Sequence, residues 1–153
     1  MVAGSELGPL PGPPLPALLD AALTRFVDRF QALIEQTPHA ELRLAHSSNV
    51  LRWLQGGPQR PADLVGLSGV SKQAISQQVA RMIELGYVEA AAHPTDGRAH
   101  LVQLTPRGED AQRVVHELFE RIEAEWRAQL PGPAWDAFRT GLVEVSGTTA
   151  PTT

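Results

Sequence analysis

The chain of 153 residues contains no cysteine and no long apolar run. The lack of cysteine excludes disulfides, thiolate metal sites, cysteine nucleophiles and a cysteine redox switch. No stretch approaches the roughly 18 consecutive apolar residues of a membrane span. Met1 to Pro16 also lacks the basic start and apolar core of a signal peptide. We therefore expect a soluble, cytoplasmic protein with no membrane partner.

A strong positive charge is also missing, because 13 Lys and Arg residues stand against 17 Asp and Glu residues, for a net charge of -4. This total is unfavourable for nucleic-acid binding, but the charges are unevenly placed. Residues 58–108 hold 5 basic and 4 acidic residues, whereas residues 109–153 hold 4 and 8. Any attraction to phosphate must therefore come from the middle of the chain.

Composition predicts an ordered middle with flexible ends. Proline and glycine indicate a flexible segment over 1–14, and serine, glycine and threonine indicate a flexible tail over 146–153. The apolar content of 42% is enough for one core between them. We therefore expect a single domain over 15–145.

The first ordered element is predicted to be a long helix. Apolar residues recur every three or four positions from Leu15 to Ile34, which predicts a helix over 15–37 that Pro38 ends. This apolar stripe is longer than one small domain needs for docking a helix. Part of it is therefore expected to bury against another chain.

Residues that typically begin or end helices predict three further helices. Ser47 and Ser48 are expected to cap a short helix over 50–54, which Gly56 and Gly57 end. The next helix starts at Pro61 and ends before Gly69, and its inward residues are expected to be Leu64, Val65 and Leu67. The third starts after Ser71 and ends at Gly86, with Ile75, Val79, Met82 and Ile83 inward.

A change of period then predicts a hairpin and two closing helices. Strand candidates over 87–92 and 99–104 flank turn residues at 93–97, so the two strands should pair. Thr105 and Pro106 start a helix that Pro131 ends, and a weaker helix follows up to residue 145. The predicted fold is mainly α, a helix-turn-helix with a two-stranded β wing and additional helices at both ends.

The outward face of the helix after Ser71 carries the candidate binding chemistry. At 100° per residue, Gln73, Gln77, Ala80 and Glu84 point away from Ile75, flanked by Ser76 and Arg81, and Lys72 stands at the start. Glutamine forms two hydrogen bonds with adenine, serine bonds either donor or acceptor, and a cation binds guanine or phosphate. The face suits a major groove, although the same residues also suit a solvated helix surface.

The motifs together resemble the MarR family of winged-helix transcriptional regulators. The resemblance rests on the runs Val70 to Ser76, Gly86 to Val88, and Asp96 to Gly108. It implies a DNA-binding core over 47–107 and dimerisation helices over 15–37 and 106–145. It also implies a homodimer on double-stranded DNA with a pseudo-palindromic operator, acting as a repressor. Independently, the sequence shows no nucleophile elbow, no phosphate-binding glycine loop and no catalytic carboxylate pair, so we expect no catalytic activity and no cofactor.

The resemblance also assigns roles to individual residues. The recognition-helix contacts are expected to be Ser71, Lys72, Gln73, Ser76, Gln77 and Arg81. Arg98 is expected to contact DNA at the wing tip, with Asp96 supporting it. The chain departs from the family pattern at Ala90 to Ala92, where a basic residue is common, and at Ser68, where an apolar residue usually precedes the turn. We expect Leu67 to take the place of that apolar residue.

The resemblance further implies a small-molecule effector bound between the dimer helices and the winged core. Arg43, His46 and Trp53 are candidate ligand contacts, although a core position suits Trp53 better. His116 and Glu120 lie one helical turn apart, but two ligands without a third do not make a metal site. A competing interpretation is a winged-helix module that binds another protein and has negligible affinity for DNA.

Overall fold

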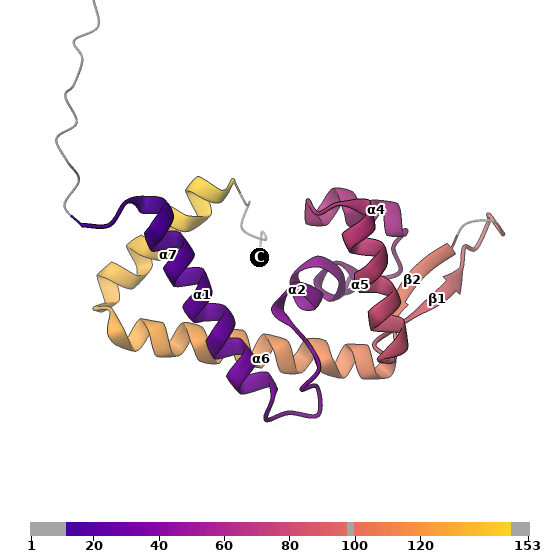
Figure 1. The fold of residues 1–153 in the computed structure, drawn as a ribbon, viewed down its shortest axis with the longest axis horizontal. Coiled ribbons are helices and arrows are strands. Elements are labelled where there is room, and N and C mark those ends of the chain that lie inside the picture. Colours follow the sequence, from indigo (N-terminus) through magenta and orange to yellow (C-terminus); the bar gives the residue numbers. More distant parts are fainter. Residues whose placement is uncertain (1–11, 98–99, 148–153) are drawn as a thin grey trace, which may run out of the picture.

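The computed structural model describes residues 12–97 and 100–147. The long helix α6 (Pro106–Gln129) lies along two groups of elements and joins them (Figure 1). At one end it lies with α1 (Leu15–Ile34) and α7 (Gly132–Ser146). At the other end stand α4 (Pro61–Ser68), α5 (Lys72–Glu84) and a hairpin of β1 (Val88–Ala92) and β2 (His100–Leu104). The predicted mainly helical fold with a two-stranded wing is confirmed.

Helix α1 ends at Ile34, before the predicted limit at residue 37. The Thr37 hydroxyl donates to the Ile34 carbonyl at 2.7 Å, and the Gln36 amide donates to the Ala32 carbonyl at 2.9 Å. These side chains satisfy the last carbonyls of the helix, and the residue before a proline disfavours the helical region. The chain therefore leaves the helix before Pro38 is reached.

The segment after α1 forms one continuous helical stretch over 44–54, which is longer than the short helix predicted to follow Ser47 and Ser48. It comprises α2 (Leu44–His46), the π-helical η1 (Ser47–Leu51) and α3 (Arg52–Leu54). The prediction that Ser47 and Ser48 cap this helix is wrong, because the helix begins three residues earlier. The buried face of this helix consists of Ser47, Val50, Leu51 and Leu54. Burial of this face stabilises the helix, which therefore starts before the two serines.

The caps of the helix-turn-helix and of α6 follow the sequence. The Ser71 hydroxyl accepts the Ala74 N–H at 3.2 Å, and the Thr105 hydroxyl accepts the Gly108 N–H at 3.1 Å. Gly69 ends α4 with a φ of 71°, a left-handed conformation that favours glycine. These interactions are local, so the sequence predicts them well.

Two residues expected to face inward are exposed. Leu67 is 44% exposed and Ile83 is 45% exposed, whereas Leu64, Ile75 and Met82 are fully buried. Ile83 lies about 80° round the helix from Ile75, at the edge of the buried face. Leu67 does not replace the apolar residue missing at position 68. The half-buried Val65 and Val70 pack against the core there instead.

The wing contains one pairing that the sequence did not predict. Val88 pairs with Leu104 and Ala92 pairs with His100 in the antiparallel hairpin, as expected. In addition, Gln59 and Val102 exchange backbone hydrogen bonds of 2.9 and 2.8 Å, so the residue two before α4 extends the sheet beside β2. The wing is therefore tied directly to the start of the helix-turn-helix.

The core is continuous from the winged part to α1 and α6, but the outer half of α1 is not covered. Phe30 is fully buried and its ring lies 5.7 Å from the ring of Phe119 on α6. The exposed apolar side chains of the two terminal helices are Leu15, Leu18, Leu19, Leu23 and Val27 on α1, and Phe138, Leu142 and Val145 on α7. Within the described residues, no helix is long and apolar enough to cross a membrane.

Candidate nucleic-acid interface and adjoining cleft

Helix α5 presents the polar face that the sequence predicted. Ile75, Val79 and Met82 anchor the helix in the core. The six predicted recognition contacts are all exposed: Ser71, Lys72, Gln73, Ser76, Gln77 and Arg81. Ser71 uses its oxygen as the helix cap, which leaves its hydroxyl proton available to donate to a phosphate. The structure thus brings these residues together on one exposed surface.

The two neighbouring glutamines of α5 differ in their surroundings. Gln77 is exposed, whereas Gln78 is half-buried and its Oε1 accepts a hydrogen bond of 3.3 Å from the Asn49 amide on η1. Gln78 therefore links α5 to the core. Gln77 has no hydrogen-bond partner within the described residues, so its amide is free to bind another molecule.

Arg81 has an acidic partner on its own helix. Its Nη1 lies 3.0 Å from Glu84 Oε2, and both side chains are more than half exposed. Exposed pairs of this kind contribute little free energy, so a phosphate competes readily for the guanidinium. The guanidinium of Arg81 can therefore bind a phosphate group. The pair with Glu84 does not hold it in one fixed position, as a specific contact with a base would require.

The turn of the wing is organised by His93. Its Nδ1 accepts the backbone N–H groups of Thr95 at 3.3 Å and Asp96 at 3.1 Å, so this nitrogen is the unprotonated one. Arg98, the predicted wing-tip contact, lies outside the described residues. Its support by Asp96 therefore stays a prediction from the sequence.

Arg60 is a candidate contact that the sequence reasoning missed. It directly precedes α4, and its Nη2 lies 3.4 Å from His93 Nε2 on the wing. The pairing of Gln59 with Val102 brings it there, and that pairing joins residues 43 positions apart in the sequence. The only sequence signal was a cation in the slightly basic middle segment.

The three predicted effector contacts lie around α2 and α3. The Arg43 backbone N–H donates to His46 Nδ1 at 3.2 Å, and its guanidinium donates to the Leu42 carbonyl at 3.3 Å. Burial, followed by Arg43 and Arg81, lowers the pKa of His46. The half-buried Trp53 packs against the core, with the Arg52 guanidinium 4.1 Å from its ring centre.

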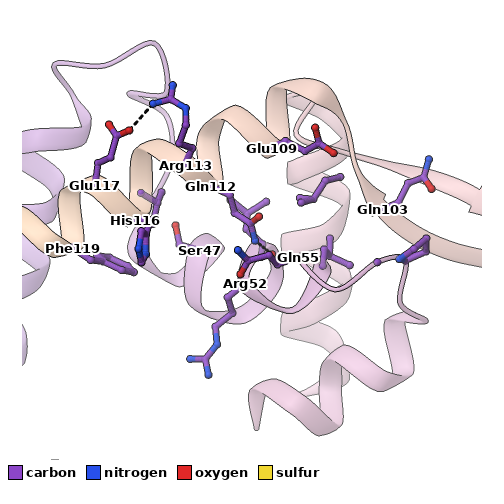
Figure 2. Close-up of a pocket in the computed structure, with 16 residues that line it drawn as sticks. Ser47, Arg52, Gln55, Gln103, Glu109, Gln112, Arg113, His116, Glu117 and Phe119 are labelled. Atoms are coloured by element: carbon purple, nitrogen blue, oxygen red, sulfur yellow. Dashed lines mark hydrogen bonds and ion pairs between the residues drawn. The ribbon is translucent and has the colours of Figure 1, made fainter. Parts of the chain in front are cut away.

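The structure has an open cleft of about 890 Å³ where α3 and η1 face α6 (Figure 2). Its polar lining consists of Ser47, Arg52, Gln55, Gln103, Glu109, Gln112, Arg113, His116 and Glu117. None of the three predicted effector contacts belongs to the described residues that line it. The cleft therefore offers a second location for a ligand, beside the one predicted around Arg43.

One side chain of this cleft is an unpartnered buried hydroxyl. Ser47 is 3% exposed, and its Oγ has no hydrogen-bond partner among the described residues. Gln112, next to it in Figure 2, donates to the Leu51 carbonyl from α6. A buried polar atom without a partner costs free energy, so it needs an explanation.

No metal site accompanies this geometry in residues 12–97 and 100–147, where no three His, Asp or Glu side chains are grouped as ligands. His116 Nε2 instead lies 3.3 Å from Glu120 Oε1 as an exposed pair on α6.

A helix-turn-helix followed by a two-stranded wing defines the winged helix-turn-helix class of proteins, and α4, α5, β1 and β2 have this arrangement. Within that class, the MarR family's sequence model matches residues 44–99 of this chain. No curated protein matches the chain in sequence.

Solved structures share the fold over most of the chain. The reduced form of MarR from E. coli has a TM-score of 0.76 at 19% identity, with 88% of this chain and 97% of that chain covered. E. coli MarR complexed with operator DNA, in a mutant form, has a TM-score of 0.73 at 21% identity, covering 86% and 93%. BpsR of Bordetella bronchiseptica, whose DNA binding is regulated by 6-hydroxynicotinic acid, has a TM-score of 0.69 at 24% identity, covering 86% and 97%. The resemblance to the MarR family is confirmed, and the chain has the family's winged-helix fold.

Proposed function

We propose that this chain is a transcriptional regulator that binds double-stranded DNA through α5. The observation that carries the proposal is the exposed Gln and Ser face of α5, held on a buried row of Ile75, Val79 and Met82. This residue set hydrogen-bonds base edges, and Lys72 and Arg81 flank it with positive charge for phosphate. The operator complex of E. coli MarR, which has the same fold, supports the assignment.

We further propose that the regulator acts as a cytoplasmic homodimer. The exposed apolar side chains belong to α1 and α7, which lie at the end of the molecule away from the wing (Figure 1), and exposed apolar residues in such number favour association. A two-fold dimer presents two α5 helices to successive major grooves, about 34 to 36 Å apart. The operator is then pseudo-palindromic, because its symmetry follows that of the protein.

Selection of bound sequences from a random DNA pool at near-physiological salt tests both statements. We expect enrichment of an inverted repeat whose half-sites are about one helical turn apart. The mass of the complex in solution should correspond to two chains on one DNA duplex. Weak binding without enrichment that vanishes as salt rises would contradict DNA recognition, and would favour a module that contacts proteins. A monomeric mass at micromolar concentration would contradict the dimer.

Repression released by a small molecule is the finer part of the proposal. The cleft beside Ser47 lies between the helix that supports α5 and helix α6, so a ligand there contacts both parts of the molecule. A ligand that prefers one arrangement of these parts shifts the population toward it. The regulation of BpsR by 6-hydroxynicotinic acid supports an aromatic carboxylate as the first probe.

Thermal unfolding with a panel of aromatic carboxylates, including 6-hydroxynicotinic acid, tests the effector. We expect a raised Tm and weaker operator binding with at least one member, since a ligand stabilises the state that binds it. Ser47→Ala is expected to abolish much of the ligand shift. In the absence of ligand it should leave the free energy of unfolding unchanged or raise it by about 1 kcal/mol, because it removes an unpartnered hydroxyl.

Arg43→Ala is the matched variant for the alternative site predicted around α2. Loss of the ligand shift in Arg43→Ala, with Ser47→Ala unaffected, would move the effector to that site. A Tm that stays constant across the whole panel would contradict effector control by this class of molecule.

A further inference from the structure

A cluster of polar side chains around two buried rings lies where the segment after α1 meets the end of α5 and the start of α6. His39 is 3% exposed and Tyr87 is fully buried. His39 Nδ1 lies 3.2 Å from the Tyr87 hydroxyl, and His39 Nε2 lies 2.8 Å from Asp110 Oδ2. Arg107 Nη2 donates to the same hydroxyl at 3.2 Å and also pairs with Glu41. The proposed DNA contacts use none of these residues.

The charged groups of the cluster come from α6 and from the segment that contains His39. Asp110 on α6 forms hydrogen bonds with both Arg113 and His39. These two interactions lower the pKa of Asp110, and the one with Arg113 has the larger effect. Glu41 comes from the same segment as His39. Burial alone would raise its pKa, but a backbone hydrogen bond, the Tyr87 hydroxyl and Arg107 together lower it. Both carboxyl groups therefore stay ionised at neutral pH and only accept hydrogen bonds.

The neutral state of His39 has a single consistent hydrogen-bond pattern. Because the Asp110 carboxylate only accepts, Nε2 carries the ring proton and Nδ1 is an acceptor. The Tyr87 hydroxyl then donates to Nδ1, while its oxygen accepts the N–H of Arg107. Burial raises the pKa of Tyr87 to about 12, so the hydroxyl keeps its proton.

A second pattern satisfies the protonated state. When Nδ1 also carries a proton, it donates to the Tyr87 oxygen, and the hydroxyl proton must turn to another acceptor. The Glu41 carboxylate lies beside the hydroxyl, because Arg107 Nη2 contacts both groups, and it is the acceptor that the second pattern requires. We propose that the Tyr87 hydroxyl is a two-position switch, which donates to His39 when His39 is neutral and to Glu41 when His39 is protonated.

The backbone of Tyr87 places this switch between the recognition helix and α6. Its N–H donates to the Met82 carbonyl of α5 at 2.9 Å, and its carbonyl accepts the Thr105 N–H, at the cap of α6, at 3.1 Å. A change in the hydroxyl's partner therefore acts at the junction of the winged part and the long helix. The dependence of operator binding on the switch rests on the proposed function, whereas the switch itself does not.

The chain has a single tyrosine, so a ¹³C label at the tyrosine Cζ reports only this hydroxyl. Histidine is the side chain that changes charge between about pH 5 and pH 8. As pH is varied, we expect the ¹³Cζ signal of the free full-length chain to change together with the ¹⁵N signals of the His39 ring. In Glu41→Ala, which lacks the second acceptor, the change in the ¹³Cζ signal should be smaller.

His39→Gln is expected to give a ¹³Cζ signal independent of pH, because glutamine does not titrate. His116→Gln, which changes an exposed histidine on α6, is the matched control and should titrate like the wild type. A constant ¹³Cζ signal in the wild type, or a titration that persists in His39→Gln, would overturn the switch. Should His39→Gln fail to fold, the wild-type ¹⁵N and ¹³Cζ midpoints decide the question, because unequal midpoints overturn the proposal equally.

A parallel titration of operator affinity separates the two proposals. Operator affinity that varies with pH in the wild type and not in His39→Gln would connect the switch to DNA binding. Absence of operator binding with an intact ¹³Cζ titration would contradict the proposed function and leave the switch standing.

Discussion

Gly108→Ala is expected to be strongly destabilising, although alanine normally favours a helix. A Cβ at this position would lie 2.0 Å from the Tyr87 carbonyl oxygen, 3.0 Å from its carbon and 3.1 Å from Leu104 Cδ2. The nearest atom belongs to the backbone and cannot rotate away. The same carbonyl accepts the Thr105 N–H at 3.1 Å, so moving it also disturbs the cap of α6.

The expected loss for Gly108→Ala is about 3 kcal/mol or more in free energy of unfolding, at or above the upper end of ordinary overpacking. Urea unfolding followed by circular dichroism measures it. Gly141→Ala on α7 is the matched control, because a Cβ there meets nothing within 4 Å. That variant should gain up to about 1 kcal/mol from helix propensity. Equal stability of the two variants would contradict the close approach of α6 to Tyr87.

Features set by neighbouring residues could be predicted from the sequence. Ser71 and Thr105 cap the helices that follow them, and Gly69 and Gly86 end the helices that precede them. In each case the relevant hydrogen bond or positive φ involves residues only a few positions apart. The exposed face of α5 follows from helical periodicity for the same reason, once Ile75 is placed inward.

Features set by distant residues could not be predicted. Ser47 was expected to cap a helix because its hydroxyl has the right chemistry, but the packing of Val50 and Leu51 buries it inside one. The contact of His39 with Asp110 joins residues 71 positions apart, and no local pattern specifies it. Gly108 was noticed only within a motif, because the carbonyl that forbids a side chain there belongs to Tyr87.

Gln77→Ala is expected to weaken operator binding and to relax base choice at one position of each half-site. Gln77 is exposed on the face of α5 that is proposed to enter the major groove, and a glutamine amide forms two hydrogen bonds with adenine. The expected cost is about 1 to 3 kcal/mol, which corresponds to about a 5- to 150-fold weaker Kd. Fluorescence anisotropy with the selected operator and its single-base variants measures both effects.

Gln78→Ala is the control for this prediction, because it removes the same side chain from the next residue. The Gln78 amide is held by Asn49, so this variant should leave base choice unchanged and act through the anchoring of α5. The dependence of log Kd on salt should also stay unchanged in Gln77→Ala, since no phosphate contact is lost.

Arg98→Ala, chosen from the sequence, should instead weaken binding to all sequences and lower the salt slope by about one. Equal and sequence-independent losses in Gln77→Ala and Arg98→Ala would contradict this division between base and phosphate contacts.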